Sequence, residues 1–547
     1  MKSSQRLTAL LGATALTLMA GAHALAKPSV ASATTATPIK HLVVIYGENV
    51  SFDHYFGTYP HAANPPGEPA FRAKKNTPTD IDTVENAGLL TNNPNYLNPL
   101  NGTGAANPFR LDVTQVATAD QNHSYTPEEQ AEDNSAADLF PLYTGNGTPG
   151  GAGAFGTTGQ VMGYYDGNTV SALWSYAQNF AMSDNARTDG YGPSTPGALE
   201  VVSGQTNGMQ IVLDTNGKTS YYVPDGQGGY TLINDVDPGN DVCSSTTNTS
   251  LFSGKNIGDL LNLARITWGS FMGGFNLSTK NPNGTTGCAR TTMSTNTNVT
   301  EIDYIPHHAW FQYYQSTQNP THARPTSVAA IGHTYVPDTK TLDPANHEYD
   351  INDFYAAVQS GNFPAVSYLK APSYQDAHAG YSDPADEQNF IVQVVNFLEQ
   401  QKGWKETAVI VTYDDSDGWY DHSYAAPTSA SYSTADQLNG SGVCGTGTQK
   451  NGVNGLPVNG RCGPGVRIPF VVISKYAKRN YVSHTPITQA SVVKFIEDNW
   501  LLGARLGGGS FDDSTGSIMD MFDFSSPKAP ELFLSPQTGL KTASSKR

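Results

Sequence analysis

Three short, almost continuously apolar runs constrain the fold of this 547-residue chain more than any other feature. They are His41 to Tyr46 (HLVVIY), Ala408 to Tyr413 (AVIVTY) and Ile468 to Ile473 (IPFVVI). Their β-branched content and lack of polar alternation are typical of strands buried on both faces of a parallel sheet. Apolar residues also recur at helical spacing in Phe390 to Leu398 and in Val492 to Trp500. Strands alternating with helices predict an α/β fold with a mostly parallel sheet and helices on both faces.

Two polar stretches interrupt this pattern. Residues 206–300 are rich in Asn, Thr, Ser and Gly and have weak periodicity, which predicts a loop-rich insertion over the sheet. Residues 65–104 form a second polar excursion, and Pro364 to Leu369 is a weaker strand candidate. We therefore expect one catalytic domain over residues 38–505, followed by a C-terminal extension over residues 506–547.

Residues 1–26 have the organisation of a signal peptide. Lys2 and Arg6 provide a basic start, Leu7 to Ala20 an apolar stretch, and Ala24 to Ala26 a small-x-small cleavage site. A membrane anchor is the alternative, but the apolar stretch is short and rich in Ala, Gly and Thr. We expect a secreted or periplasmic protein that has no integral membrane segment after cleavage.

The charge balance excludes some partners. A formal net charge of −17 argues against a nucleic-acid binder, which normally presents a basic patch. The same charge disfavours strong docking on anionic membranes. An acidic protein still binds phosphate where a metal ion inverts the local field.

The cysteines predict disulfides. None of Cys243, Cys288, Cys444 and Cys462 forms a C-x-x-C pair, so a zinc site built from them is disfavoured. In an oxidising compartment two disulfides are expected, with three possible connectivities. We favour Cys243 with Cys288 and Cys444 with Cys462, because each pair brackets a polar, Gly/Asn/Thr-rich excursion that a crosslink restrains.

The ends of two predicted strands carry oxygen ligands. Glu48 and Asn49 follow the first strand closely, and Asp414 and Asp415 follow AVIVTY directly. Ligands of open α/β sheets bind at the carboxyl ends of strands, and hard cations prefer oxygen ligands. Adjacent carboxylates also repel each other unless a cation or a proton intervenes. A polar turn capped by Asn and an ordinary surface acid cluster are the alternative interpretations.

A Gly-Pro-Ser turn supplies a hydroxyl group. Ser194 follows Gly192 and Pro193 at the predicted start of a helix, where backbone N–H groups attract an anion. Serine needs a base or a metal ion to become a nucleophile, and an ordinary helix cap is the alternative. Histidines in polar loops add candidate groups, although a lone histidine is usually only hydrogen-bonded. They are His123, His307, His308 and His378.

Together these motifs resemble the bacterial phosphoesterase family of secreted acid phosphatases and phospholipases C, whose fold is related to alkaline phosphatase and arylsulfatase. The match runs from IKHLVVIYGENVSFDHYFG through DQNHS, GPSTP and DAHAGYSDP to VTYDDSDGWYDH and RIPFVVIS. It extends from about Ile39 to Trp500 outside the polar insertion, and ENVSFDHYFG and TYDDSDGWYDH are its specific motifs. The resemblance implies an alkaline-phosphatase-like sheet and a divalent metal ion whose identity stays open.

The resemblance also implies residue roles. Ser194 matches the nucleophile, which forms a phosphoserine, and its oxygen also touches the metal ion. The other implied metal ligands are Glu48, Asn49, Asp414 and Asp415. The groups around the phosphoryl oxygens and the leaving group are His123, His308 and His378, with His307 as a companion. Phospholipase-like members carry a DHTS segment, and either His484 or Gln489 occupies its histidine position here. A second metal site therefore stays open.

The substrate has two candidate classes. The segments YIPHHAWFQYY, DAHAGYSDP and DDSDG look more like the acid-phosphatase branch, so a phosphate monoester is the first expectation. A phospholipase C that hydrolyses phosphodiester head groups is the alternative, because the core chemistry is the same. The expected partner is accordingly a phosphorylated small molecule or a lipid-derived substrate. A catalytically inactive binding protein is a third interpretation, although no element of the expected site is missing.

Overall fold

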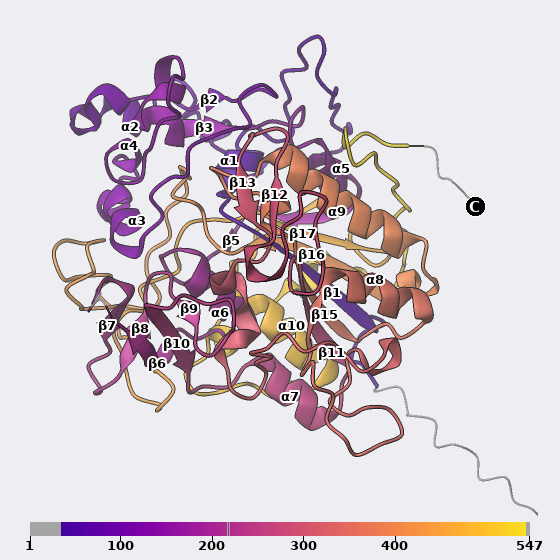
Figure 1. The fold of residues 1–547 in the computed structure, drawn as a ribbon. Coiled ribbons are helices and arrows are strands. Elements are labelled where there is room, and N and C mark those ends of the chain that lie inside the picture. The colour runs from indigo at the N-terminus through magenta and orange to yellow at the C-terminus, as the bar shows by residue number, and fades with distance from the viewer. Residues whose placement is uncertain (1–33, 216, 218, 543–547) are drawn as a thin grey trace, which may run out of the picture. The chain divides into compact units, whose positions relative to one another are not determined.

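The computed structural model describes residues 34–215, 217 and 219–542 (Figure 1). The predicted signal peptide lies outside these residues. The core is an eight-stranded sheet in the order β14-β11-β15-β1-β16-β17-β4-β18. Its strands are β1 (His41–Gly47), β4 (Ala181–Ser183), β11 (Trp268–Met272), β14 (Glu348–Asp350), β15 (Val366–Lys370), β16 (Thr407–Tyr413), β17 (Phe470–Ser474) and β18 (Tyr481–Ser483).

The sheet is mostly parallel, as predicted. β1 lies between β15 and β16 and is parallel to both, and β15, β11 and β14 continue in parallel. All four apolar runs, including the weaker candidate that became β15, form buried strands of this sheet. β17 is the exception, because it runs antiparallel to β16 and β4. No helix is assigned between β16 and β17, and a parallel return requires a crossover that is usually helical.

Helices cover both faces of the sheet. The Tyr46 hydroxyl donates to a backbone carbonyl of α6 (Ser194–Ser203), on one face. The Tyr413 hydroxyl donates to Glu387 of α9 (Pro384–Glu399). Tyr46 lies opposite the residue that precedes Tyr413, and side chains alternate between faces along a strand, so α6 and α9 lie on opposite faces. Helix α10 (Ala490–Trp500) packs against α6 on the same face. The predicted helical stretches thus lie within α9 and α10.

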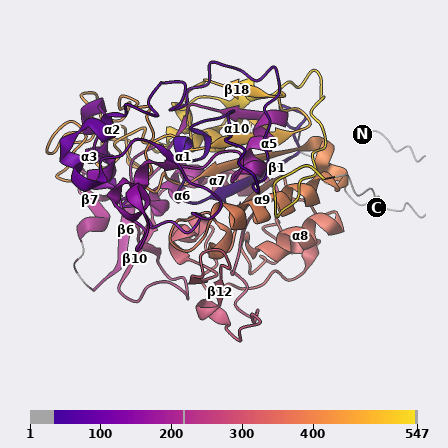
Figure 2. The ribbon, with the colours of Figure 1, turned by 90° about the horizontal axis from the view of Figure 1, so that it is seen from above.

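A second, smaller sheet belongs to the polar insertion. It has five strands in the order β7-β8-β6-β10-β9. They are β6 (Asn207–Asp214), β7 (Tyr222–Pro224), β8 (Tyr230–Leu232), β9 (Asp237–Pro238) and β10 (Asn248–Phe252). Both views place this sheet at the same end of the molecule as α2 (Pro94–Leu97) and α3 (Tyr125–Ala131) (Figures 1 and 2).

Contrary to expectation, the polar stretch over residues 206–300 is not entirely an insertion. Its interior contributes β11 to the central sheet, between β14 and β15. The run WGSFM contains Gly and Ser between its apolar residues, so its local pattern is too weak to indicate a buried strand. The insertion over the sheet is therefore shorter than expected, and its small sheet ends at Phe252.

Both favoured disulfides are present. Cys243 pairs with Cys288 and Cys444 with Cys462, with Cα–Cα distances of 5.2 and 5.9 Å. No free cysteine remains among the described residues. None of the helices in the described part of the chain has the length and apolar character needed to cross a membrane.

Candidate active site

The loops that follow β1 and β16 meet at the carboxyl edge of the sheet. The backbone N–H of Asn49 donates to the Asp414 carboxylate at 2.9 Å, and the N–H of Val50 donates to the Asp415 carbonyl at 2.9 Å. Asn49 has a φ of 62°, a left-handed conformation that is uncommon outside glycine. Apart from Ser194, the side chains expected to hold a metal ion are those of Glu48, Asn49, Asp414 and Asp415, and all four are buried here.

Ser194 joins this group from α6. Its hydroxyl donates to Glu48 Oε2 at 2.8 Å and lies 3.4 Å from Asn49 Oδ1 and 3.3 Å from Asp415 Oδ2. Ser194 is the first residue of the helix, and Pro193 is the N-cap, which has no side-chain capping bond. The Ser194 hydroxyl therefore does not act as an ordinary helix cap.

The turn before Ser194 is held by acidic side chains of other segments. Gly192 has a φ of 116°, and its N–H donates to Glu128 Oε2 at 2.9 Å. Asp235, in the insertion, accepts from the Thr195 N–H at 2.8 Å and from the Thr195 hydroxyl at 2.9 Å. These contacts leave the Ser194 oxygen directed at the carboxylate cluster.

The cluster fits a divalent cation. Glu48, Asp414 and Asp415 bring three buried carboxylates together, and Asp414 Oδ2 has no hydrogen-bond partner. Burial and the neighbouring Asp414 charge raise the pKa of Asp415 well above its usual value. A cation relieves both the repulsion and the missing contact, and an all-oxygen donor set with Asn49 and Ser194 suits a hard ion.

Lys370 is a member of the site that the sequence analysis missed. It ends β15, and its ammonium group donates to Glu48 Oε1. Burial lowers the pKa of Lys370, although Asp414 and Asp376 oppose that shift. Its sequence signal is its place directly after the strand candidate Pro364 to Leu369, because ligands bind at the carboxyl ends of strands.

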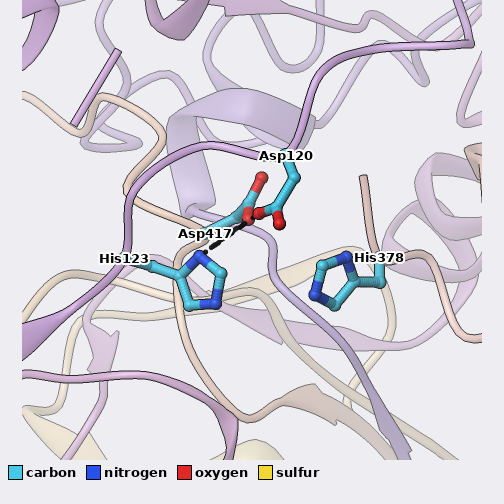
Figure 3. Close-up of side chains that lie close together, drawn as sticks. All are labelled: Asp120, His123, His378 and Asp417. Atoms are coloured by element: carbon cyan, nitrogen blue, oxygen red, sulfur yellow. Dashed lines mark ion pairs between the residues drawn. The ribbon is translucent and has the colours of Figure 1, made fainter. Parts of the chain in front are cut away.

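The side chains of His123 and His378 lie close together, near those of Asp120 and Asp417 (Figure 3). Their ring centroids lie 5.8 Å apart. His123 Nδ1 lies 3.1 Å from Asp417 Oδ1, 3.5 Å from Asp120 Oδ1 and 2.8 Å from the Gln121 carbonyl. Although Asp120, His123, His378 and Asp417 have the composition of a metal site, a nitrogen that faces a carbonyl carries a proton and is not a free ligand.

The protonation of His123 follows from these contacts. Burial alone lowers the pKa of His123, but the charges of Asp415, Asp417 and Asp120 outweigh it and raise the pKa well above its usual value. Its other nitrogen, Nε2, lies 3.4 Å from the Asn49 side-chain nitrogen. The raised pKa favours the imidazolium form of this ring, which lies beside an expected metal ligand.

His307 and His308 lie in the short 3-10 helix Pro306–His308. His308 Nδ1 lies 3.2 Å from Glu48 Oε1, whereas its buried Nε2 has no partner. Burial and the neighbouring histidines lower the pKa of His308 well below its usual value. His307 Nδ1 lies 3.5 Å from Asp237 Oδ1, and the Asp235 and Asp237 charges outweigh burial and raise the pKa of His307.

A cleft of about 1290 Å³ lies beside this cluster. All four predicted histidines line it, as does Pro193, the neighbour of Ser194. No lysine or arginine is among the described residues that line the cleft, and its acidic side chains are Asp120, Asp235, Asp237 and Glu301. The cleft therefore combines histidines with an acidic rim.

Gln489 and His484 have different surroundings in the structure. Gln489 donates from its side-chain nitrogen to the Tyr46 hydroxyl at 2.9 Å and to the Asp414 carbonyl, directly behind the carboxylate cluster. His484 Nδ1 instead lies 2.9 Å from Asp184, and half of the His484 side chain is exposed. At the start of α10, the Gln489 carboxamide thus holds the backbone of Asp414.

Comparison with known proteins identifies the family of this chain. The model of the phosphoesterase family matches residues 39–503. The chain belongs to the phosphoesterase family. The expected resemblance is thus confirmed over most of the sequence.

Several relatives of this phosphoesterase are phospholipases C. The hemolytic phospholipase C of Pseudomonas aeruginosa is 22% identical over 528 residues, which cover 92% of this chain and 59% of that protein. Phospholipase C A of Mycobacterium tuberculosis is 22% identical over 506 residues, which cover 90% of this chain and 78% of that protein. The non-hemolytic phospholipase C of Burkholderia pseudomallei is 30% identical over 176 residues, 31% of this chain and 24% of that protein. The matched parts thus span less than two thirds of the first and third of these relatives.

Solved structures show a more distant likeness. Murine ectonucleotide pyrophosphatase/phosphodiesterase 5 is similar with a TM-score of 0.29 and 10% identity, over 65% of this chain and 95% of that chain. An alkaline phosphatase superfamily protein of Vibrio parahaemolyticus has a TM-score of 0.26 and 10% identity, over 61% and 60%. The relatives' names favour the phospholipase C alternative over the phosphate monoesterase that was the first expectation.

Proposed function

We propose that this protein is a metal-dependent phosphoesterase that acts through Ser194, outside the cytoplasm. The observation that carries the proposal is the placement of the Ser194 hydroxyl 2.8–3.4 Å from the oxygens of three expected metal ligands. The residues proposed to hold a divalent ion are Glu48, Asn49, Ser194, Asp414 and Asp415. The two disulfides support a site of action in an oxidising compartment.

The reaction starts at the Ser194 oxygen. A bound divalent ion lowers the pKa of this hydroxyl and neutralises charge on the phosphoryl group. Glu48, which already accepts the hydroxyl hydrogen bond, takes the proton as Ser194 attacks phosphorus. The bond between phosphorus and the leaving oxygen breaks, and that oxygen receives a proton from imidazolium His123. A phosphoserine ester remains.

In the second half of the reaction, His123 and Glu48 exchange their roles as proton donor and proton acceptor. Neutral His123 takes a proton from water, which attacks the phosphoserine from the side that the first leaving group vacated. The bond between phosphorus and the Ser194 oxygen breaks, and that oxygen regains a proton from Glu48. The negative charge of a bound phosphoryl group favours the imidazolium forms of His308 and His378, and their Nε2–H groups are proposed to donate to the phosphoryl oxygens. Two displacements give net retention at phosphorus.

For the substrate we propose a phosphodiester with a cationic head group, hydrolysed as a phospholipase C does. The support is the acidic rim of the cleft, which favours a positive charge next to the phosphate, together with the names of the relatives. The phosphate monoester is retained as a second candidate, because the four histidines that line the cleft provide contacts for the additional oxygen of a monoester.

Two measurements test this proposal. Turnover is measured with and without a chelator, followed by add-back of a series of divalent ions, and loss without recovery by any ion contradicts the metal-dependent mechanism. Equimolar p-nitrophenylphosphorylcholine and p-nitrophenyl phosphate are then compared. A higher kcat/KM for the choline ester supports the diester proposal, and the reverse order supports the monoesterase.

A further inference from the structure

The segment between residues 93 and 101 is built inside out. Its buried side chains are polar, with at most 5% exposed, and they are Asn93, Asn95 and Asn101. Its exposed residues include Tyr96, Leu97 and Leu100, whose side chains are apolar and which are 52%, 63% and 65% exposed. The hydrophobic effect favours the opposite arrangement. Packing within the described chain therefore does not explain the outward leucines.

Hydrogen bonds hold this segment without help from its apolar side chains. Asn95 accepts from the Phe140 N–H at 2.9 Å and donates to the Ala137 carbonyl at 2.8 Å. Asn93 donates to the Tyr420 hydroxyl at 2.9 Å. These amides attach the segment to α4 (Phe140–Tyr143) and to the loop that follows β16. These hydrogen bonds thus fix the position of the segment, and its exposed leucines take no part in them.

Helix α4 adds a fourth exposed apolar side chain to this part of the surface. Leu142 of α4 is 45% exposed, and Figure 1 shows α2 and α4 close together at one end of the molecule. We call Tyr96, Leu97, Leu100 and Leu142 the apolar corner. Leucine and tyrosine together are typical of surfaces that insert into the interfacial layer of a bilayer.

The C-terminal end of α4, which carries Leu142 of the apolar corner, is hydrogen-bonded to the lining of the cleft. The Asn122 N–H donates to the Thr144 carbonyl at 2.8 Å, and the Asn122 side chain donates to the Tyr143 carbonyl at 3.1 Å. Asn122 and the adjacent His123 both line the cleft. The end of α4 and the catalytic histidine loop are therefore connected directly.

The charge of the chain indicates which kind of lipid surface the apolar corner contacts. No charged residue occurs from Asn86 to Phe109, whereas the chain as a whole carries a net charge of −17. An anionic membrane repels such a protein, but a zwitterionic membrane does not. We propose that the apolar corner docks the protein on a zwitterionic lipid surface, next to which lipid head groups enter the cleft. This inference rests on the diester function proposed above.

The test uses the full mature protein and phosphatidylcholine vesicles. Wild type is expected to float with the vesicles, and L97S/L100S is expected to bind at least about tenfold more weakly, because two apolar side chains no longer enter the lipid. L142S provides a second variant on the other helix. The matched control is L263S/L502S, because Leu263 and Leu502 are exposed leucines of α7 (Ile257–Ala264) and the loop after α10. The control is expected to bind as wild type does.

Turnover of soluble p-nitrophenylphosphorylcholine separates docking from catalysis. L97S/L100S is expected to keep the wild-type rate on this substrate while it loses activity on vesicles. Equal vesicle binding by wild type and L97S/L100S, or an equal loss in the control, overturns the docking proposal. A wild-type dimer that L97S/L100S dissociates in sedimentation velocity also overturns it, in favour of a second copy of the chain. Vesicle binding without turnover of the soluble ester refutes the proposed function and leaves the docking surface standing.

Discussion

Asp53 and His422 join the two loops that carry the proposed metal ligands. Asp53 Oδ2 accepts from the His422 backbone N–H at 2.8 Å and lies 2.6 Å from His422 Nδ1. Arg467 completes the buried cluster, with its Nε 2.8 Å from Asp421. The family motifs FDHYFG and GWYDH thus meet here, a few residues beyond Glu48–Asn49 and Asp414–Asp415, and fix the two loops relative to each other.

This contact predicts a pH-dependent stability. Burial opposes protonation, but Asp53 and Asp82 outweigh it and raise the pKa of His422 to about 10, with Arg467 acting against them. Because the folded pKa exceeds the unfolded value of about 6.5, the stabilisation is fully present below about pH 6.5 and is lost as pH rises through about 10. It is on the order of a few kcal/mol.

Urea unfolding across this pH range measures the effect. The free energy of unfolding of wild type is expected to fall between about pH 6.5 and 10 more steeply than that of H422Q. H333Q is a control at a histidine outside the cluster. Parallel pH profiles for wild type and H422Q contradict the assignment.

Loss of a carboxylate charge is expected to remove the metal ion. D414N and D415N each keep the shape of the side chain but weaken a hard-ion site, so both metal content and turnover should fall. Elemental analysis after dialysis and kcat/KM provide the two measurements. D338N, at an exposed loop position, is expected to behave as wild type. Wild-type metal content in both site variants would refute the ligand assignment.

Ser194 is expected to be essential and its neighbour Thr195 only supportive. S194A should lose several orders of magnitude in turnover, because the covalent route disappears while metal ligands and histidines remain. S194T should keep measurable activity. T195A removes one hydroxyl contact with Asp235 but not the backbone contact, so its loss should be about tenfold or less. Acid trapping and peptide mapping should place phosphate on Ser194, and phosphate on Thr195 would show the assignment to be wrong.

The acidic rim predicts a selective effect on KM. E301Q removes one rim charge, and the KM for p-nitrophenylphosphorylcholine should rise about threefold while kcat is unchanged, since a partly exposed charge pair is worth less than about 1 kcal/mol. The KM for p-nitrophenyl phosphate should stay constant or fall. An equal rise for both substrates would indicate a structural effect of the substitution.

The two disulfides predict that the native protein has no free thiol. Thiol titration of the unfolded, unreduced protein should give a value close to zero. C243S/C288S should lower the free energy of unfolding by about 2–4 kcal/mol, because the crosslink limits the unfolded chain. Four reactive thiols in the unfolded wild type would contradict both bridges and weaken the proposed site of action.

The sequence by itself determined the features that depend on local pattern. HLVVIY and AVIVTY are apolar throughout, so each run identifies a buried strand without knowledge of its partners. The residues after these runs then occupy one edge of the sheet, as Glu48 and Asp414 do, because parallel strands end on the same side. The disulfide pairs could also be predicted from the sequence, since each crosslink closes a polar excursion that is local in the chain.

The tertiary structure alone decided the features that depend on distant partners. Trp268–Met272 is a strand because β14 and β15 flank it, and Lys370 belongs to the site because Glu48 directly follows the adjacent strand β1. Gln489 rather than His484 lies behind the metal loops, because the start of α10 packs there. The buried Asn95 and its exposed leucine neighbours likewise reverse the pattern that composition favours. In each case a buried polar group is satisfied by a partner far away in sequence, and no local pattern records that partner.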